Sequence, residues 1–176
     1  ADLRIAKDIW KKVATSVGIE KFPIFLRHFW ISRKPLVRQE QLFKTIRAEI
    51  KTNQQVFTLL NDLDNYSESY LALQDPFNIL WQGNRERIKR IREMKLFGIK
   101  QQLPLLMVAK EKFTDQEFDK TLKVISILSF RYNVIGSRQA NRMEELYNSV
   151  SQKIFNSTLT TAQGVFNEIR ELYISD

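Results

Sequence analysis

Residues that form turns are scarce in this chain and stand far apart. Its 176 residues include four prolines and only five glycines, Gly18, Gly83, Gly98, Gly136 and Gly164. A sheet protein needs a turn after each short strand, usually built from glycine, proline or asparagine. The long intervals between breakers therefore favour helices, and we expect an all-α fold.

Apolar residues recur three or four positions apart within these intervals, as they do on the buried face of a helix. The segments that show this spacing are 3–17, 23–30, 36–51, 52–73, 85–97, 103–109, 115–135, 138–155 and 160–173. We expect eight or nine helices in a single multi-helix domain over residues 1–176. Gly83 is the point at which this domain could divide into sub-lobes 1–82 and 84–176.

Three helix starts carry a hydrogen-bonding pattern that the sequence makes visible. Thr52 or Asn53 can cap the helix that follows it. The segment Thr114-Asp-Gln-Glu117 has the form of a capping box, in which the hydroxyl and the carboxylate each bind a backbone N–H of the other residue. Residues 160–163 show a second possible box.

The helix near residues 115–135 is the candidate for the centre of the fold. No charged residue occurs between Lys123 and Arg131, so several of its sides can be buried. Gly136 is a natural left-handed stop for this helix.

The chain carries a basic surplus, with a formal net charge of +8. Such a surplus fits an anionic partner such as nucleic acid, although it also keeps a protein soluble. Between Arg85 and Lys100 seven basic residues oppose only two acidic ones. The candidates for contact with nucleic-acid phosphates are Arg85, Arg87, Lys89, Arg90, Arg92 and Lys95. The alternative is a solvated helix face with internal pairing, such as Glu86 with Arg90.

Catalytic chemistry has little support in the sequence. His28 is the only histidine and there is no cysteine, which excludes a thiol nucleophile and a two-histidine metal site. His28 lies in an apolar segment, so we interpret it as a packing residue. We expect no enzyme activity, metal or cofactor in this segment. Phe97 and Tyr132 are the aromatic residues nearest to basic clusters, and they are candidates for stacking on a base.

The chain shows no feature that would place it in a membrane. No apolar run approaches the ~20 residues that a membrane span needs, and the start lacks a signal-peptide pattern. The absence of cysteine is compatible with a reducing compartment, and we expect a cytoplasmic protein. The chain begins at Ala1 and ends at Asp176, two residues after an apolar pair. We expect both ends to be cuts in a longer protein.

The junction from Phe130 to Met143 gathers basic and amide side chains at the exit of the predicted central helix. Arg131 falls near that helix end, where a cation offsets the negative end of the helix dipole. Asn141 and Arg142 fall in the first turns of the next helix. The alternative interpretation is an arginine and asparagine cluster that binds phosphate or organises a surface between domains.

Two segments, 90–109 and 130–147, carry a family resemblance. The first reads Arg90-Ile-Arg-Glu-Met-Lys-Leu-Phe-Gly-Ile-Lys-Gln-Gln-Leu-Pro-Leu-Leu-Met-Val-Ala109, and the second contains Phe130-Arg-Tyr-Asn-Val-Ile-Gly136 and Asn141-Arg-Met-Glu-Glu-Leu-Tyr147. They resemble the helical region of bacterial proteins that begin with a ParB-like domain and belong to the GmrSD-type, modification-dependent restriction group. By position, Arg131, Gly136 and Asn141 match the family's Arg–Gly–Asn pattern.

The resemblance implies a helical domain downstream of a ParB-like domain, with that domain as a partner in the same chain. The parent protein would be a nucleotide-dependent nuclease, and this segment would lack its catalytic motifs. We therefore expect a non-catalytic scaffold or accessory domain of a bacterial DNA-targeting defence protein, in contact with the DNA backbone through the basic helix. The alternative is a helical protein–protein interaction module without a nucleic-acid role.

Overall fold

The computed structural model describes residues 2–131 and 140–172, and within these ranges it contains helices and no strands. The predicted all-α class and the predicted number of helices are confirmed. The elements are α1 (Asp2–Val17), α2 (Phe22–Ile31), α3 (Gln39–Glu49), α4 (Asn53–Ala72), η1 (Ile79–Trp81), α5 (Arg85–Leu96), α6 (Leu103–Lys112), α7 (Asp115–Phe130), α8 (Ala140–Phe155), α9 (Ala162–Ile169) and η3 (Arg170–Leu172). In the described part of the chain, every helix is too short or too polar to cross a bilayer.

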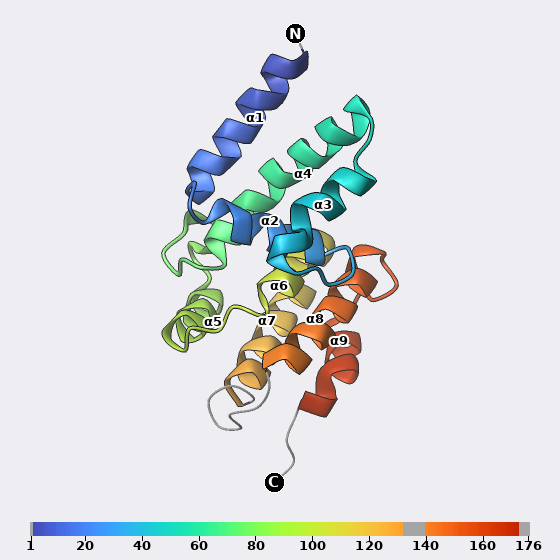
Figure 1. The fold of residues 1–176 in the computed structure, drawn as a ribbon. Helices are drawn as coiled ribbons and strands as arrows, with labels where there is room; N and C mark the ends of the chain where they lie inside the picture. The colour runs from blue at the N-terminus through green and yellow to red at the C-terminus, as the bar shows by residue number, and fades with distance from the viewer. Residues whose placement is uncertain (1, 132–139, 173–176) are drawn as a thin grey trace.

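The helices form two groups with α2 between them (Figure 1). The long helices α1 and α4 lie side by side at one end of the molecule, and α3 packs against α2. Helices α5 to α9 fill the other end, where α6 packs against α8 and α5 packs against α7. Helix α2 contacts both groups, because it packs against α4 as well as against α6 and α8.

One apolar core joins the two groups. A single cluster of buried residues includes Phe25 of α2, Leu63 of α4, Leu106 of α6 and Tyr147 of α8. The core therefore crosses Gly83, the position at which the sub-lobes were predicted to divide.

Helix α6 is more completely buried than α7, the helix that was predicted to lie at the centre. Every residue from Leu103 to Ala109 is buried, and α6 contacts α2, α4, α7 and α8. Helix α7 lies directly beside it, but α7 exposes Lys123 and Ile127. Helix α7 has apolar residues on several sides because it packs against three neighbours, α5, α6 and α9.

The cap of α4 forms as predicted. Thr52 accepts a hydrogen bond from the backbone N–H of Gln55, and the side chain of Gln55 accepts one from the backbone of Thr52. At α9 the cap is Thr161, one residue later than predicted, and it accepts from the N–H of Gly164. The box predicted for residues 160–163 does not form, because Gly164 has no side chain to return the hydrogen bond.

The predicted box at α7 forms only in part. Thr114 accepts from the N–H of Glu117, as expected. The carboxylate of Glu117 turns instead to α9, where it accepts from the N–H of Ala162 at 2.7 Å, and it also pairs with Lys120. Since these hydrogen bonds favour the charged carboxylate, the pKa of Glu117 is lowered, first by Lys120 and then by the Ala162 amide.

Helix α3 differs from its predicted extent and face. It begins at Gln39 rather than near residue 36, and Phe43, one of the apolar residues expected to form the buried face of segment 36–51, is 61% exposed. Leu42 fills the core position of that turn. A helix three turns long that packs only along one edge buries a narrow stripe, and Phe43 falls outside it.

Two polar contacts bind α8 to α2. The buried side-chain amide of Asn148 donates to the carbonyl oxygens of Ile31 and Lys34, at 2.7 and 2.8 Å. Arg27 pairs with Glu144 one turn earlier on α8, at 2.8 Å. The amide satisfies carbonyl groups that the end of α2 leaves open.

Candidate nucleic-acid interface

Helix α5 is set off from its neighbours by a glycine at each end. Gly83 and Gly98 both have positive φ angles, of 83° and 65°, a conformation that costs glycine little. Asn84 caps the helix by accepting from the N–H of Arg87 at 3.0 Å. The helix ends at Leu96, one residue before the end of the predicted segment 85–97.

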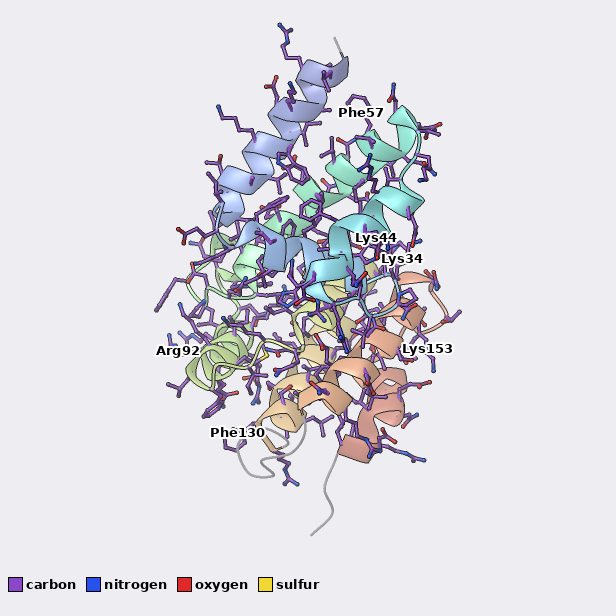
Figure 2. The ribbon with its side chains drawn as sticks, in the orientation of Figure 1. Lys34, Lys44, Phe57, Arg92, Phe130 and Lys153 are labelled. Atoms are coloured by element: carbon purple, nitrogen blue, oxygen red, sulfur yellow. The ribbon has the colours of Figure 1, made fainter. Side chains whose placement is uncertain are left out.

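The outer face of α5 carries a row of cations. Arg85, Lys89 and Arg92 are exposed, and because they are four and three residues apart they lie on one side of the helix. At a rise of ~1.5 Å per residue, the row is roughly 10 Å long. Lys95 is exposed close to this row, and Figure 2 shows Arg92 at the outer edge of the molecule. Within residues 2–131 and 140–172, none of these four cations forms an ion pair.

Arg87 points the opposite way, into the contact with α7. It is buried, its Nη2 lies 2.8 Å from a carboxylate oxygen of Asp115, and its Nε pairs with Asp119. Burial acts to lower the pKa of Arg87, but the hydrogen bonds to both carboxylates outweigh it and the pKa is raised. Arg87 therefore stabilises the α5–α7 contact, and it does not face solvent as the prediction of phosphate contact requires.

Arg90 is also occupied within the protein. Its guanidinium lies 2.7 Å from Glu86 and 3.1 Å from Glu93, one turn away on either side. The sequence had left internal pairing of Glu86 with Arg90 as an alternative, and the structure confirms that pairing. Two of the six candidate residues are thus neutralised by carboxylates, and four remain free to meet a phosphate.

The two kinds of arginine on α5 should respond differently to mutation. We expect Arg87→Ala to lower the free energy of unfolding by about 2 kcal/mol, because it removes a buried arginine that makes charged hydrogen bonds to α7. Arg92→Ala should change it by less than about 0.5 kcal/mol, as is usual for an exposed side chain. Urea unfolding of both variants measures the difference, and equal effects would contradict the assignment of Arg87 as a structural residue.

An exposed aromatic ring lies against the cation row. Phe77 is 79% exposed, and the guanidinium carbon of Arg92 lies 5.7 Å from its ring centre. Sequence reasoning missed Phe77 and selected Phe97 and Tyr132 instead. Phe97 is only partly exposed because its ring packs on Phe130, at 4.5 Å between ring centres, and Tyr132 lies outside the described residues. The sequence signal for an exposed Phe77 was the turn at Asp75-Pro76, because a residue in a turn does not belong to the apolar stripe of a helix.

The structure places Phe130 and Arg131 of the predicted junction beside α5. Arg131 follows the last residue of α7 and lines a cavity of about 400 Å³ together with Arg90, Phe97 and Phe130. Two further residues of that junction, Asn141 and Arg142, are exposed at the start of α8, and Arg142 lies 3.4 Å from Glu171 of η3. Gly136 lies outside the described residues.

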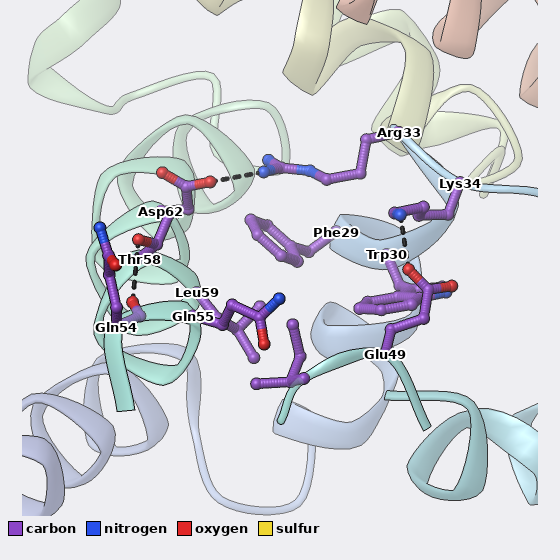
Figure 3. Close-up of a pocket in the computed structure, with 11 residues that line it drawn as sticks. Phe29, Trp30, Arg33, Lys34, Glu49, Gln54, Gln55, Thr58, Leu59 and Asp62 are labelled. Carbon is purple, nitrogen blue, oxygen red and sulfur yellow. Dashed lines mark hydrogen bonds and ion pairs between the residues drawn. The ribbon is translucent and has the colours of Figure 1, made fainter. Parts of the chain in front are cut away.

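A second cavity, of about 370 Å³, lies between α2, α3 and α4 (Figure 3). Two ion pairs border it: Arg33 with Asp62 at 2.7 Å, and Lys34 with Glu49 at 2.5 Å. Arg33 also packs over the ring of Phe29, 3.8 Å from its centre. Both cations have a carboxylate partner, although Nε and Nη2 of Arg33 are buried without a hydrogen-bond partner in the part of the chain that the structure describes.

Comparison with known proteins identifies no relative. No family model, no curated protein and no solved structure matches the chain. Among the described residues, no group of three or more histidine and acidic side chains is arranged to hold a metal ion. The interpretation of the site therefore rests on its own geometry.

Proposed function

We propose that this chain is a non-catalytic helical scaffold domain that contacts a nucleic-acid backbone through the outer face of α5. The observation that carries the proposal is the contrast within one helix. Arg87 and Arg90 are paired with carboxylates, whereas Arg85, Lys89 and Arg92 stand in a row without an ion pair among the described residues. Exposed, unpaired cations in a row suit contact with successive phosphates.

The mechanism is electrostatic. Each phosphate that a lysine or arginine neutralises releases counterions, so affinity falls steeply as salt rises. Three to four contacts predict a decrease of roughly 40- to 150-fold between ~50 and ~200 mM salt. Such contacts position the protein on nucleic acid without reading its sequence.

The biological setting is proposed from the resemblance alone. The segments 90–109 and 130–147 support a bacterial, cytoplasmic, DNA-targeting defence protein as the parent, with a ParB-like domain in the same chain as partner. The first of these segments includes Arg90, Arg92 and Lys95 of α5. In this setting the domain would hold the parent protein against DNA while another domain carries out the chemistry.

Duplex binding by two matched triple variants tests the proposal. We expect the joint replacement of Arg85, Lys89 and Arg92 by glutamine to lower duplex affinity at least tenfold at ~50 mM salt, as measured by fluorescence anisotropy. The control replaces Lys44, Arg47 and Lys51, which are exposed on or just after α3, and so removes the same charge. Equal losses in both variants, or binding of neither duplex nor single strand by the unmodified chain, would remove the nucleic-acid contact and leave a scaffold.

The protein–protein interaction module remains a second candidate, and exposed apolar side chains favour it. Leu3 and Ile5 of α1 and Phe43 of α3 are exposed, on helices outside the group α5 to α9 (Figure 1). A partner bound through these residues would be retained when the cations of α5 are replaced, and lost in Phe43→Ala. Pull-down with each variant separates this candidate from nucleic-acid contact.

A further inference from the structure

We infer that the α5 surface takes single-stranded rather than double-stranded nucleic acid, an inference that rests on the proposed function. The α5 surface comprises Arg85, Lys89, Arg92 and the ring of Phe77. It combines two elements that a platform for single strands requires, a basic track for the backbone and an exposed aromatic ring for a base. Duplex contact would need only the first of these.

The ring of Phe77 is presented to solvent beside Arg92, at one end of the track. It is 79% exposed, and Arg92 lies against it at 5.7 Å from guanidinium carbon to ring centre. Its backbone is held by the preceding turn, since the carboxylate of Asp75 accepts from the N–H of Phe77 at 3.1 Å. A ring on a fixed turn loses little conformational freedom when a base stacks on it.

The accessibility of the base faces distinguishes a single strand from a duplex at this surface. In a duplex each base already stacks on its neighbours and lies behind the backbone, so a surface ring cannot cover a base face without unstacking it. In a single strand a base can turn toward the ring while its own phosphate meets Arg92. The guanidinium adds to this contact because it can also stack on a base plane.

Apolar groups continue along the same side of the helix. Leu96 follows Arg92 by one turn on the outer face of α5 and is 78% exposed. The cation row is therefore bounded by apolar side chains, which suits bases and sugars more than the continuous phosphate surface of a duplex. No feature of this surface distinguishes one base from another, so we expect little sequence preference.

The experiment compares a single strand of about 12 nucleotides of thymidine, within the ~4–16-nucleotide range of single-strand sites, with a duplex of equal length. Fluorescence anisotropy at ~50 mM salt is measured for the unmodified chain, Phe77→Ala and Phe43→Ala. Phe43 serves as the control because it too is an exposed phenylalanine, 61% exposed on α3. A thermal melt of each variant confirms that the fold is retained.

We expect the single strand to bind more tightly than the duplex, and Phe77→Ala to weaken single-strand binding by roughly five- to a hundredfold, the usual effect of losing one stacked base. Phe43→Ala should leave it unchanged. Equal binding of both forms, or a single-strand affinity that Phe77→Ala does not change, would overturn the inference and leave backbone contact in place. Binding of neither form would overturn the proposed function as well.

Discussion

Replacing Trp81 with alanine should lower the free energy of unfolding by about 4 kcal/mol, the usual range for removing a large buried aromatic side chain. Trp81 is fully buried, although it lies in the single turn of η1. Its ring stacks on Phe118 of α7, with ring centres 6.2 Å apart, and its indole N–H donates to the carbonyl of Ala72 at 2.7 Å. It thus connects the end of α4 to the helices that follow.

The Trp81→Ala variant also tests whether the chain unfolds as one unit or as two sub-lobes. Because the apolar core crosses Gly83, we expect one cooperative urea transition whose midpoint moves as a whole in Trp81→Ala. Trp81→Phe is the control, since it keeps most of the apolar contact and loses the indole hydrogen bond, for a cost of about 1–2 kcal/mol. Two transitions, one of them unchanged by Trp81→Ala, would show that sub-lobes 1–82 and 84–176 unfold separately.

The stability of the fold should fall below neutral pH because of His28. Burial, together with the smaller effects of the charges of Arg27 and Lys100, lowers the pKa of His28 to about 4, while Glu144 acts to raise it. In the unfolded chain the imidazole binds a proton below about pH 6.5. Between these two pKa values the unfolded state holds more protons than the folded state, so stability decreases as pH falls.

The expected loss attributable to His28 is roughly 3 kcal/mol between pH 7 and pH 4. Other groups also titrate in this range, so the measurement compares the unmodified chain with His28→Phe, which keeps a ring against Tyr70, 5.9 Å away between ring centres. Urea unfolding at several pH values should show the two curves diverging as pH falls. Parallel curves would mean that His28 titrates normally in the folded state.

Local features of the fold could be predicted from the sequence. The capping box of Thr52 and Gln55 depends on residues three positions apart, and the breaks at Gly18, Gly83 and Gly98 reflect backbone conformations with positive φ. The number of helices follows from the same local signals. Such features need no knowledge of what packs against them.

Features that depend on distant partners could not be predicted. Arg87 and Lys89 look alike in the sequence, and only the positions of Asp115 and Asp119 on α7 make one structural and leave the other exposed. The role of Glu117 at α9 likewise depends on a residue 45 positions away. The site was therefore predicted as a basic helix, while its division into paired and free cations required the structure.

The contact between α8 and the end of α2 has a consequence for synthesis of the chain. Asn148 is 114 residues beyond Lys34, so at ~5–20 residues per second the ribosome needs roughly 5 to 25 s to supply it. Throughout that interval α2, with Phe25 and Phe29 completely buried in the finished fold, has no α8 to cover it. Part of the apolar surface of α2 therefore stays uncovered in the nascent chain until α8 emerges.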